Sequence, residues 1–113
     1  MINVTFWKQS DGSYSGFDMI GHAGFAKSGS DIICAAASVL AVNTVNSIET
    51  FTAVKPVTKE SDGHLTLHLP DMSKVSDADR RAVDLLLDSM HLGLDSIRSS
   101  YGSRYLQVQT IQK

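Results

Sequence analysis

The chain has 113 residues, of which 42% are hydrophobic and 19% are charged, and its formal net charge is −2. This composition excludes an intrinsically disordered chain, and the length predicts a single domain over residues 1–113 that can bury a core without disulfides. The ten lysines and arginines are scattered along the chain, which argues against a broad nucleic-acid-binding surface.

Cys34 is the only cysteine, so the chain cannot form an intramolecular disulfide. The first residues read directly into a strand rather than a signal peptide, and no apolar run is expected to approach membrane-spanning length. We therefore expect a cytoplasmic protein with a reduced thiol and no membrane contact. His64 and His68 lie too far apart on a strand to share a metal, and no phosphate-binding loop is present, so we expect no metal and no cofactor.

The first part of the chain predicts a hairpin. Ile2, Val4 and Phe6 alternate with polar residues, which is the period of a strand. Residues 10–13 have turn chemistry around Gly12, and a second strand is predicted at about residues 14–22.

A long helix is predicted from residue 32 to residue 51, with Asp31 as its N-cap. Val39, Val42 and Val45 widen its apolar stripe, so we expect this helix to be covered on both faces. The residues expected on the stripe itself are Ile33, Ala36, Ala37, Leu40, Thr44, Ile48 and Phe51.

A second hairpin is predicted from strands at residues 57–60 and 65–69, joined by a turn at 61–63. Ser76 is expected to cap a second helix, with Asp79 at the acidic position of a capping box. A last strand is predicted at residues 104–111. The order β-β-α-β-β-α-β predicts an α+β fold, a largely antiparallel sheet with two helices packed against it.

The residues with chemical potential lie between the first hairpin and the first helix. If Asp31 is the N-cap, Cys34 occupies the first helical turn, where the helix dipole favours a thiolate. His22 ends a strand, and the loop over residues 23–30 could return its imidazole to the sulfur, forming a nucleophile with a general base. Amides at the helix start could also stabilise an oxyanion, a use that competes with capping by Asp31.

Simpler interpretations of the same residues stay open at this point. Cys34 precedes three alanines and could be a packing residue, and Asp31 could be a cap with no part in catalysis. The glycines of the loop, Gly24 and Gly29, could shape a fixed turn or allow a mobile lid, for which Phe25 is the one large apolar anchor.

The run Gly21-His22-Ala23, followed by Gly29 and by Asp31-Ile32-Ile33-Cys34-Ala35-Ala36, resembles the ribosomal-processing cysteine protease family, Prp. The family pattern is G-H-A, a short loop, G-x-D-x-x-C and then small residues, and it is present here without a gap. Lys27 and Ser28 depart from the acidic residue and tyrosine that many relatives carry before this glycine, which leaves loop–substrate contacts open.

The resemblance implies a small bacterial homodimer with endopeptidase activity. Such enzymes remove the N-terminal extension of the large-subunit ribosomal protein numbered twenty-seven, cutting after a phenylalanine-rich segment. By this likeness Cys34 is the nucleophile and His22 the base, whereas the role of Asp31 stays open. The exposed apolar residues expected on the first helix, Val39, Val42 and Val45, also favour a homodimer.

Two other functions fit the sequence. One is a non-catalytic, ribosome-associated binding module in which Cys34 only packs the start of the helix. The other is a different cysteine-based transfer reaction, such as thioester chemistry.

Overall fold

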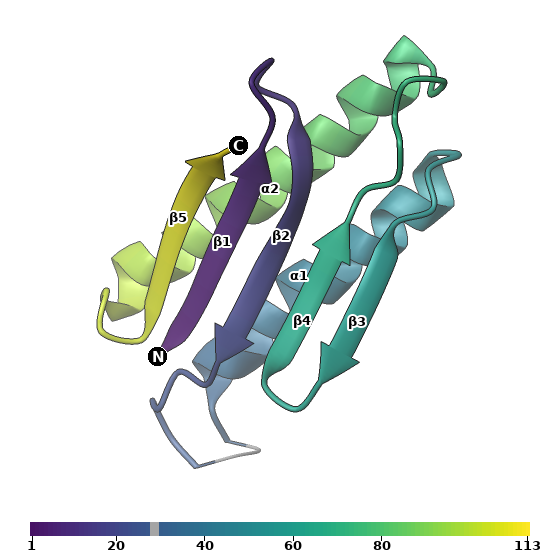
Figure 1. Cartoon of the computed structure of the whole chain (residues 1–113). Coiled ribbons are helices and arrows are strands. Elements are labelled where there is room, and N and C mark those ends of the chain that lie inside the picture. Colours follow the sequence, from purple (N-terminus) through teal and green to yellow (C-terminus); the bar gives the residue numbers. More distant parts are fainter. Residues whose placement is uncertain (28–29) are drawn as a thin grey trace.

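The computed structural model describes residues 1–27 and 30–113. A five-stranded sheet has the order β3-β4-β2-β1-β5, and two helices lie behind it in the view of Figure 1. All strand pairs are antiparallel except β1–β5, which is parallel. The elements are β1 (Ile2–Lys8), β2 (Tyr14–Gly21), α1 (Ile32–Phe51), β3 (Val57–Ser61), β4 (His64–His68), α2 (Asp77–Tyr101) and β5 (Leu106–Gln112).

This arrangement confirms the predicted α+β fold, and the order of the elements is the predicted one. The strand bounds differ from the prediction by one or two residues, as in β5, which begins at Leu106 instead of residue 104. The bounds of α1 agree with the prediction at both ends. The parallel β1–β5 pair follows from the helical connection, because α2 carries the chain back across the sheet before β5 begins.

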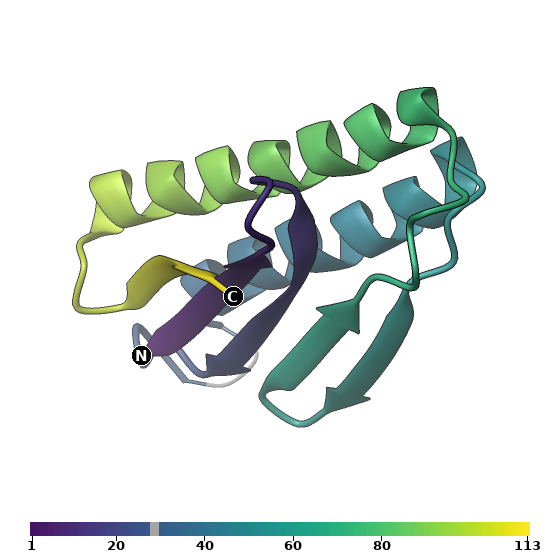
Figure 2. The same ribbon diagram turned by 45° about the horizontal axis from the view of Figure 1, so that its top comes forward.

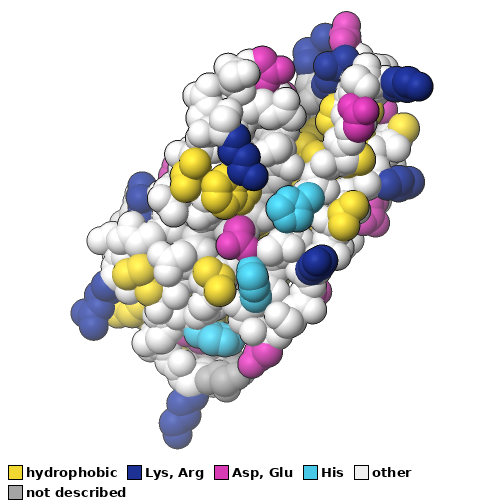
Figure 3. All heavy atoms as spheres, viewed as in Figure 1, with side chains coloured by type: hydrophobic (Ala, Val, Ile, Leu, Met, Phe, Trp, Pro, Cys, Tyr) yellow, Lys and Arg dark blue, Asp and Glu magenta, His cyan; other side chains and the backbone are white. Residues whose placement is uncertain are grey.

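The core lies between the sheet and the helix layer, and Figure 2 shows α1 and α2 side by side in that layer. In β1 the alternate residues Ile2, Val4 and Phe6 point into it, as the period of two requires, whereas every residue of β3 is exposed. The largest side chains with less than 2% exposure are Phe6, Phe17, Ile33, Ile48, Leu67, Leu87, Met90, Leu94 and Leu106. The opposite face of the sheet carries histidine and other polar side chains among scattered apolar ones (Figure 3). On this face His64 Nε2 and Asp18 Oδ1 share a hydrogen bond of 2.6 Å.

The buried stripe of α1 runs through Ile33, Ala37, Ala41, Thr44 and Ile48. A further step of four residues along the helix surface reaches Thr52, which is 9% exposed, whereas Phe51 is 73% exposed. The prediction that Phe51 belongs to the buried stripe is therefore wrong.

The other face of α1 remains uncovered in the single chain. Ile32, Val39 and Val42 are 52%, 66% and 42% exposed, so the expectation of cover on both faces is wrong for one chain, while Val45 is half-buried against the core. This 20-residue helix is also long and apolar enough to cross a membrane, which corrects the expectation that no segment approaches that length. A core helix of a globular protein meets the same criterion.

The start of α2 differs in one respect from the predicted capping box. Ser76 is the N-cap, and its Oγ accepts a hydrogen bond from the Asp79 N–H at 3.1 Å. The Asp79 carboxylate accepts instead from the Ala53 N–H at 3.0 Å. It therefore ties the segment that follows α1 to the first turn of α2.

Asp31 is the N-cap of α1, as predicted, and it also holds the preceding loop. Its Oδ1 accepts from the N–H groups of Ile33 and Cys34, both at 3.0 Å, while Oδ2 accepts from Phe25 at 3.0 Å and Ala26 at 3.4 Å. Asp31 is 8% exposed. The Cys34 N–H, followed by those of Phe25 and Ala26, holds the pKa of the Asp31 carboxyl below its ordinary value of 3.8, although burial opposes this effect.

Replacing Asp31 by alanine is expected to lower the melting temperature at pH 7 by at least about 5 °C, because a cap and a loop tether are lost together. A carboxyl whose pKa is lowered on folding stabilises the protein above its unfolded pKa, and this contribution is lost as the pH falls through the folded pKa. The difference between wild type and Asp31→Ala should therefore shrink below about pH 4 in pH-dependent thermal melts.

Ser76→Ala serves as the control, since Ser76 caps α2 through one hydrogen bond to the Asp79 N–H. If Asp31→Ala lowers the melting temperature no more than Ser76→Ala does, the loop contacts of Asp31 add nothing to stability.

Candidate active site

His22 is placed by the end of β2. Gly21, the last residue of that strand, has a φ of +105°, and a Cβ there would lie 2.3 Å from the carbonyl oxygen of Met1. Only glycine fits this position, and it turns the chain out of the sheet at His22. The Gly21 N–H also donates to the carbonyl of Gly63 at 2.8 Å. His22 therefore leaves the sheet beside the turn that joins β3 and β4.

Cys34 lies in the first turn of α1 and is half-buried. Its Sγ accepts a hydrogen bond from the Ala23 N–H at 3.2 Å. This amide and the positive end of the helix dipole both favour negative charge on the sulfur. The Cys34 thiol thus occupies a position suited to a nucleophile, as the sequence predicts.

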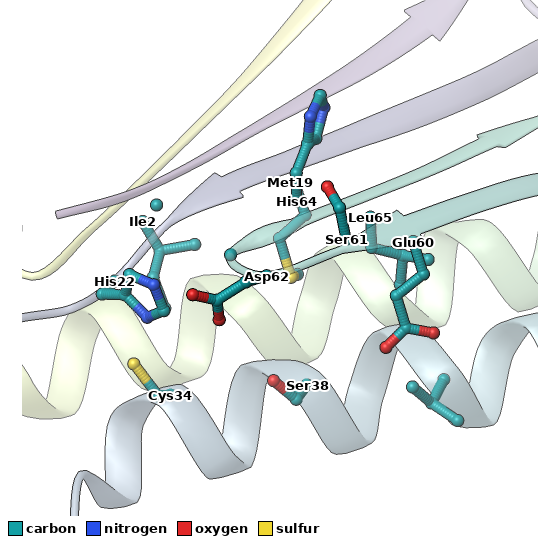
Figure 4. Close-up of a pocket in the computed structure, with 13 residues that line it drawn as sticks. Ile2, Met19, His22, Cys34, Ser38, Glu60, Ser61, Asp62, His64 and Leu65 are labelled. Atoms are coloured by element: carbon teal, nitrogen blue, oxygen red, sulfur yellow. The ribbon is translucent and has the colours of Figure 1, made fainter. Parts of the chain in front are cut away.

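The imidazole of His22 lies next to the sulfur of Cys34 (Figure 4), and both residues line the same two hollows. Within the described ranges the hydrogen bond to Sγ comes from Ala23, and none joins the His22 ring to Sγ. The structure thus brings the predicted pair together without a direct hydrogen bond.

The expected competition for the helix-start amides is resolved in favour of Asp31. The N–H groups of Ile33 and Cys34 both donate to its Oδ1. In this arrangement the Cys34 amide is occupied by the cap, so it is not free to stabilise an oxyanion.

Two hollows meet at Cys34, with volumes of about 270 and 540 Å³. The residues shared by both are His22, Cys34, Ser38 and Asp62. The smaller hollow continues along α1 to Val42 and faces Glu60, whereas the larger one is bounded by Gly24, Ala26 and Ala35. A ligand can therefore approach the sulfur along a path that extends to both sides of it.

Two residues of the site, Ser38 and Asp62, were not predicted as site residues from the sequence. The spacing of four residues from Cys34 to Ser38 places both on one side of α1, which a helical pattern could have indicated. Asp62 reaches the site only because β4 pairs with β2, a long-range contact that no local pattern reveals.

The part of the loop that the structure describes is anchored at several points. Phe25 packs edge-on against the rings of Tyr101 and Tyr105, with centroids 5.8 and 5.3 Å away, and Gly24 has a φ of +70°. Asp31 holds the backbone at Phe25. The mobile lid stays a prediction. Both the lid and the loop–substrate contacts partly depend on Ser28 and Gly29, which lie outside the described residues.

Comparisons with known proteins identify the family of this chain. The family model described as cysteine protease Prp matches residues 1–107. The chain is 27% identical over 103 residues to the ribosomal processing cysteine protease Prp of Bacillus subtilis, covering 89% of this chain and 90% of that protein.

Two crystal structures of the ribosomal processing protease Prp from S. aureus are also similar. One, in complex with a covalently linked product peptide, has a TM-score of 0.86 and 27% identity, and the other, with a substrate peptide, has a TM-score of 0.79 and 26% identity. Each match covers 98% of this chain and 100% of the other. Since the family model spans nearly the whole chain and the fold agrees throughout, this protein is a cysteine protease and belongs to the Prp family.

Proposed function

We propose that this protein is an endopeptidase that removes the N-terminal extension of the bacterial large-subunit ribosomal protein numbered twenty-seven, cutting after a phenylalanine-rich segment. Cys34 acts as the nucleophile and His22 as the base. The observation that carries the proposal is the position of the Cys34 thiol, at the start of α1 between two hollows and beside the imidazole of His22. The names of the relatives support ribosomal processing, and the peptide complexes of S. aureus Prp support a peptide substrate.

The chemistry proceeds by acyl transfer. His22 takes the proton of Cys34, the thiolate attacks the scissile carbonyl carbon, and the resulting tetrahedral intermediate collapses as the imidazolium protonates the leaving amine. His22 then takes a proton from water, whose oxygen attacks the thioester carbon. Collapse of this second intermediate releases the new carboxyl end and the thiolate of Cys34. The two hollows would hold the segments of substrate on either side of the scissile bond.

The environment of Cys34 argues against the rival binding module. A cysteine that only packs a helix would be enclosed by apolar side chains, whereas Cys34 is half-buried and lines two open hollows. A different cysteine-based transfer would use the same pair of residues, and the products distinguish it from hydrolysis.

Cys34→Ala and Cys34→Ser are expected to abolish cleavage of the extended ribosomal protein, since neither side chain supplies a thiolate. The fold should persist, because a small residue fits this half-buried helix position. His22→Ala should also abolish cleavage and should slow the alkylation of Cys34 by iodoacetamide at pH 7. Intact-mass spectrometry reports the shortened substrate, and circular dichroism reports the fold.

Full cleavage by a folded Cys34→Ala protein would rule out the nucleophile assignment. Alkylation at the wild-type rate in His22→Ala would show that the two side chains do not interact in the free enzyme. A product in which the substrate is joined to another group would instead indicate a transfer reaction.

We further propose that the enzyme is a cytoplasmic homodimer joined partly through α1. The support is the uncovered apolar face of that helix, where Val39 is 66% and Val42 42% exposed. An apolar hollow of about 510 Å³ adjoins it between α1 and α2, bounded by Val39, Leu40, Gly93 and Ile97. Contiguous apolar surface of this kind favours association.

Val39→Asp is expected to convert the dimer to a monomer at micromolar concentration, because it places a charge at the centre of this face. Sedimentation velocity measures the change. Ile111→Asp, at an exposed position in the edge strand β5, is the control and should leave the dimer intact. A wild-type protein that sediments only as a monomer would contradict the dimer.

A further inference from the structure

We infer that Asp62 is a positioning residue for His22, holding the imidazolium by its negative charge during the reaction. This inference rests on the proposed function of Cys34 and His22. Asp62 comes from the turn between β3 and β4, which contributes no residue to the motif that identified the pair. Figure 4 shows the Asp62 carboxylate turned toward the imidazole of His22, while the sulfur of Cys34 lies on another side of the ring.

The turn that carries Asp62 is held against His22 by the backbone. The Gly21 N–H donates to the Gly63 carbonyl at 2.8 Å, and these two glycines directly adjoin His22 and Asp62 in the chain. The turn and the ring are also in close contact, because a Cβ built on Gly63 would lie 2.8 Å from His22 Nε2. Gly63 itself has a φ of +70°. The position of the Asp62 backbone relative to His22 is thus set by the sheet.

The other charged groups at the site are engaged elsewhere or lie farther along the hollow. The titratable residues that line the two hollows with His22 are Asp31, Cys34, Glu60, Asp62 and His64. Asp31 accepts four backbone hydrogen bonds, and His64 pairs with Asp18 at 2.6 Å. Glu60 lies farther along the hollow, beyond Ser61 in Figure 4. Asp62 is therefore the carboxylate placed to face the imidazole.

The chemistry gives this carboxylate a role at the step where charge develops. When His22 takes the proton of Cys34, the ring becomes positive, and a carboxylate beside it stabilises and orients the imidazolium. Asp62 is exposed in the free protein, so solvent screens the interaction. A peptide that covers the hollow would exclude this water, which strengthens the charge pair in the complex.

The experiment compares Asp62→Asn and Asp62→Glu with wild type. The control is Asp77→Asn, the same change at an exposed carboxylate in the first turn of α2 that lines neither hollow. Asparagine removes the charge but suits a turn, so Asp62→Asn should keep its melting temperature. Two rates are measured, cleavage of the extended ribosomal protein and alkylation of Cys34 by iodoacetamide at pH 7. We expect Asp62→Asn to lower kcat about fivefold to tenfold with KM within about twofold, and to slow alkylation about twofold to fivefold. Asp62→Glu should recover most of both losses, and Asp77→Asn should match wild type.

Wild-type kcat in Asp62→Asn would overturn the inference, as would a loss confined to KM, which would make Asp62 a substrate contact. An equal loss in Asp77→Asn would also overturn it, because the effect would then belong to the overall charge of the protein and not to the position of Asp62. If wild type cleaves nothing, the proposed substrate is wrong, yet alkylation still decides the role of Asp62: equal rates in wild type and Asp62→Asn would refute it.

Discussion

The carboxylate of Asp31 joins the two segments on which the site depends. One oxygen binds the first turn of α1, which carries Cys34, and the other binds the backbone at Phe25 and Ala26, shortly after His22. The four N–H groups would otherwise be buried or half-buried donors with no partner of comparable strength. A single buried side chain therefore couples the conformation of the loop to the start of the helix.

This coupling matters because the reacting groups come from different layers of the fold. His22 follows a strand of the sheet, Cys34 belongs to a helix, and Asp62 belongs to a hairpin turn. Their relative positions depend on the packing of α1 against the sheet and on the pairing of β2 with β4. The loop between His22 and Cys34 connects the sheet to the helix, and its described part is held by Asp31 and by the packing of Phe25 on two tyrosine rings.

Much of this arrangement is predictable from local signals in the sequence. The strand alternation around Val4, the Asp31 cap and the glycine-containing turns each depend on residues close in the chain, and the structure agrees with them. The pairing of His22 with Cys34 in one site was predictable from a local motif, in which eleven residues lie between the two. Phe51 was misassigned because hydrophobicity alone does not decide which residue of the last turn faces the core. A small change in helical phase buries Thr52 instead, whose Oγ bonds the Ile48 carbonyl.

Other features depend on contacts that are distant in the sequence. Asp62 was predictable as a turn residue, but its place beside His22 follows from the register of β2 and β4. The second oxygen of Asp31 accepts hydrogen bonds from loop amides, and the position of these amides cannot be predicted from residue propensities. The Asp79 carboxylate likewise accepts from Ala53, in the segment that follows α1, rather than from the local partner that the capping-box pattern suggested.

The parallel pairing of β1 with β5 has a consequence for biosynthesis. β1 occupies an interior place in the sheet, yet one of its two neighbours is β5, which follows every other described strand in the chain. The hairpins β1–β2 and β3–β4 can form early because their strands are close in the chain, whereas closure of the sheet beside β1 must wait for β5 to emerge from the ribosome. Until then one edge of β1 is unpaired, and the part of the core that Leu106 will fill is open to water. A nascent chain therefore has the parts of its active site before it has a complete core.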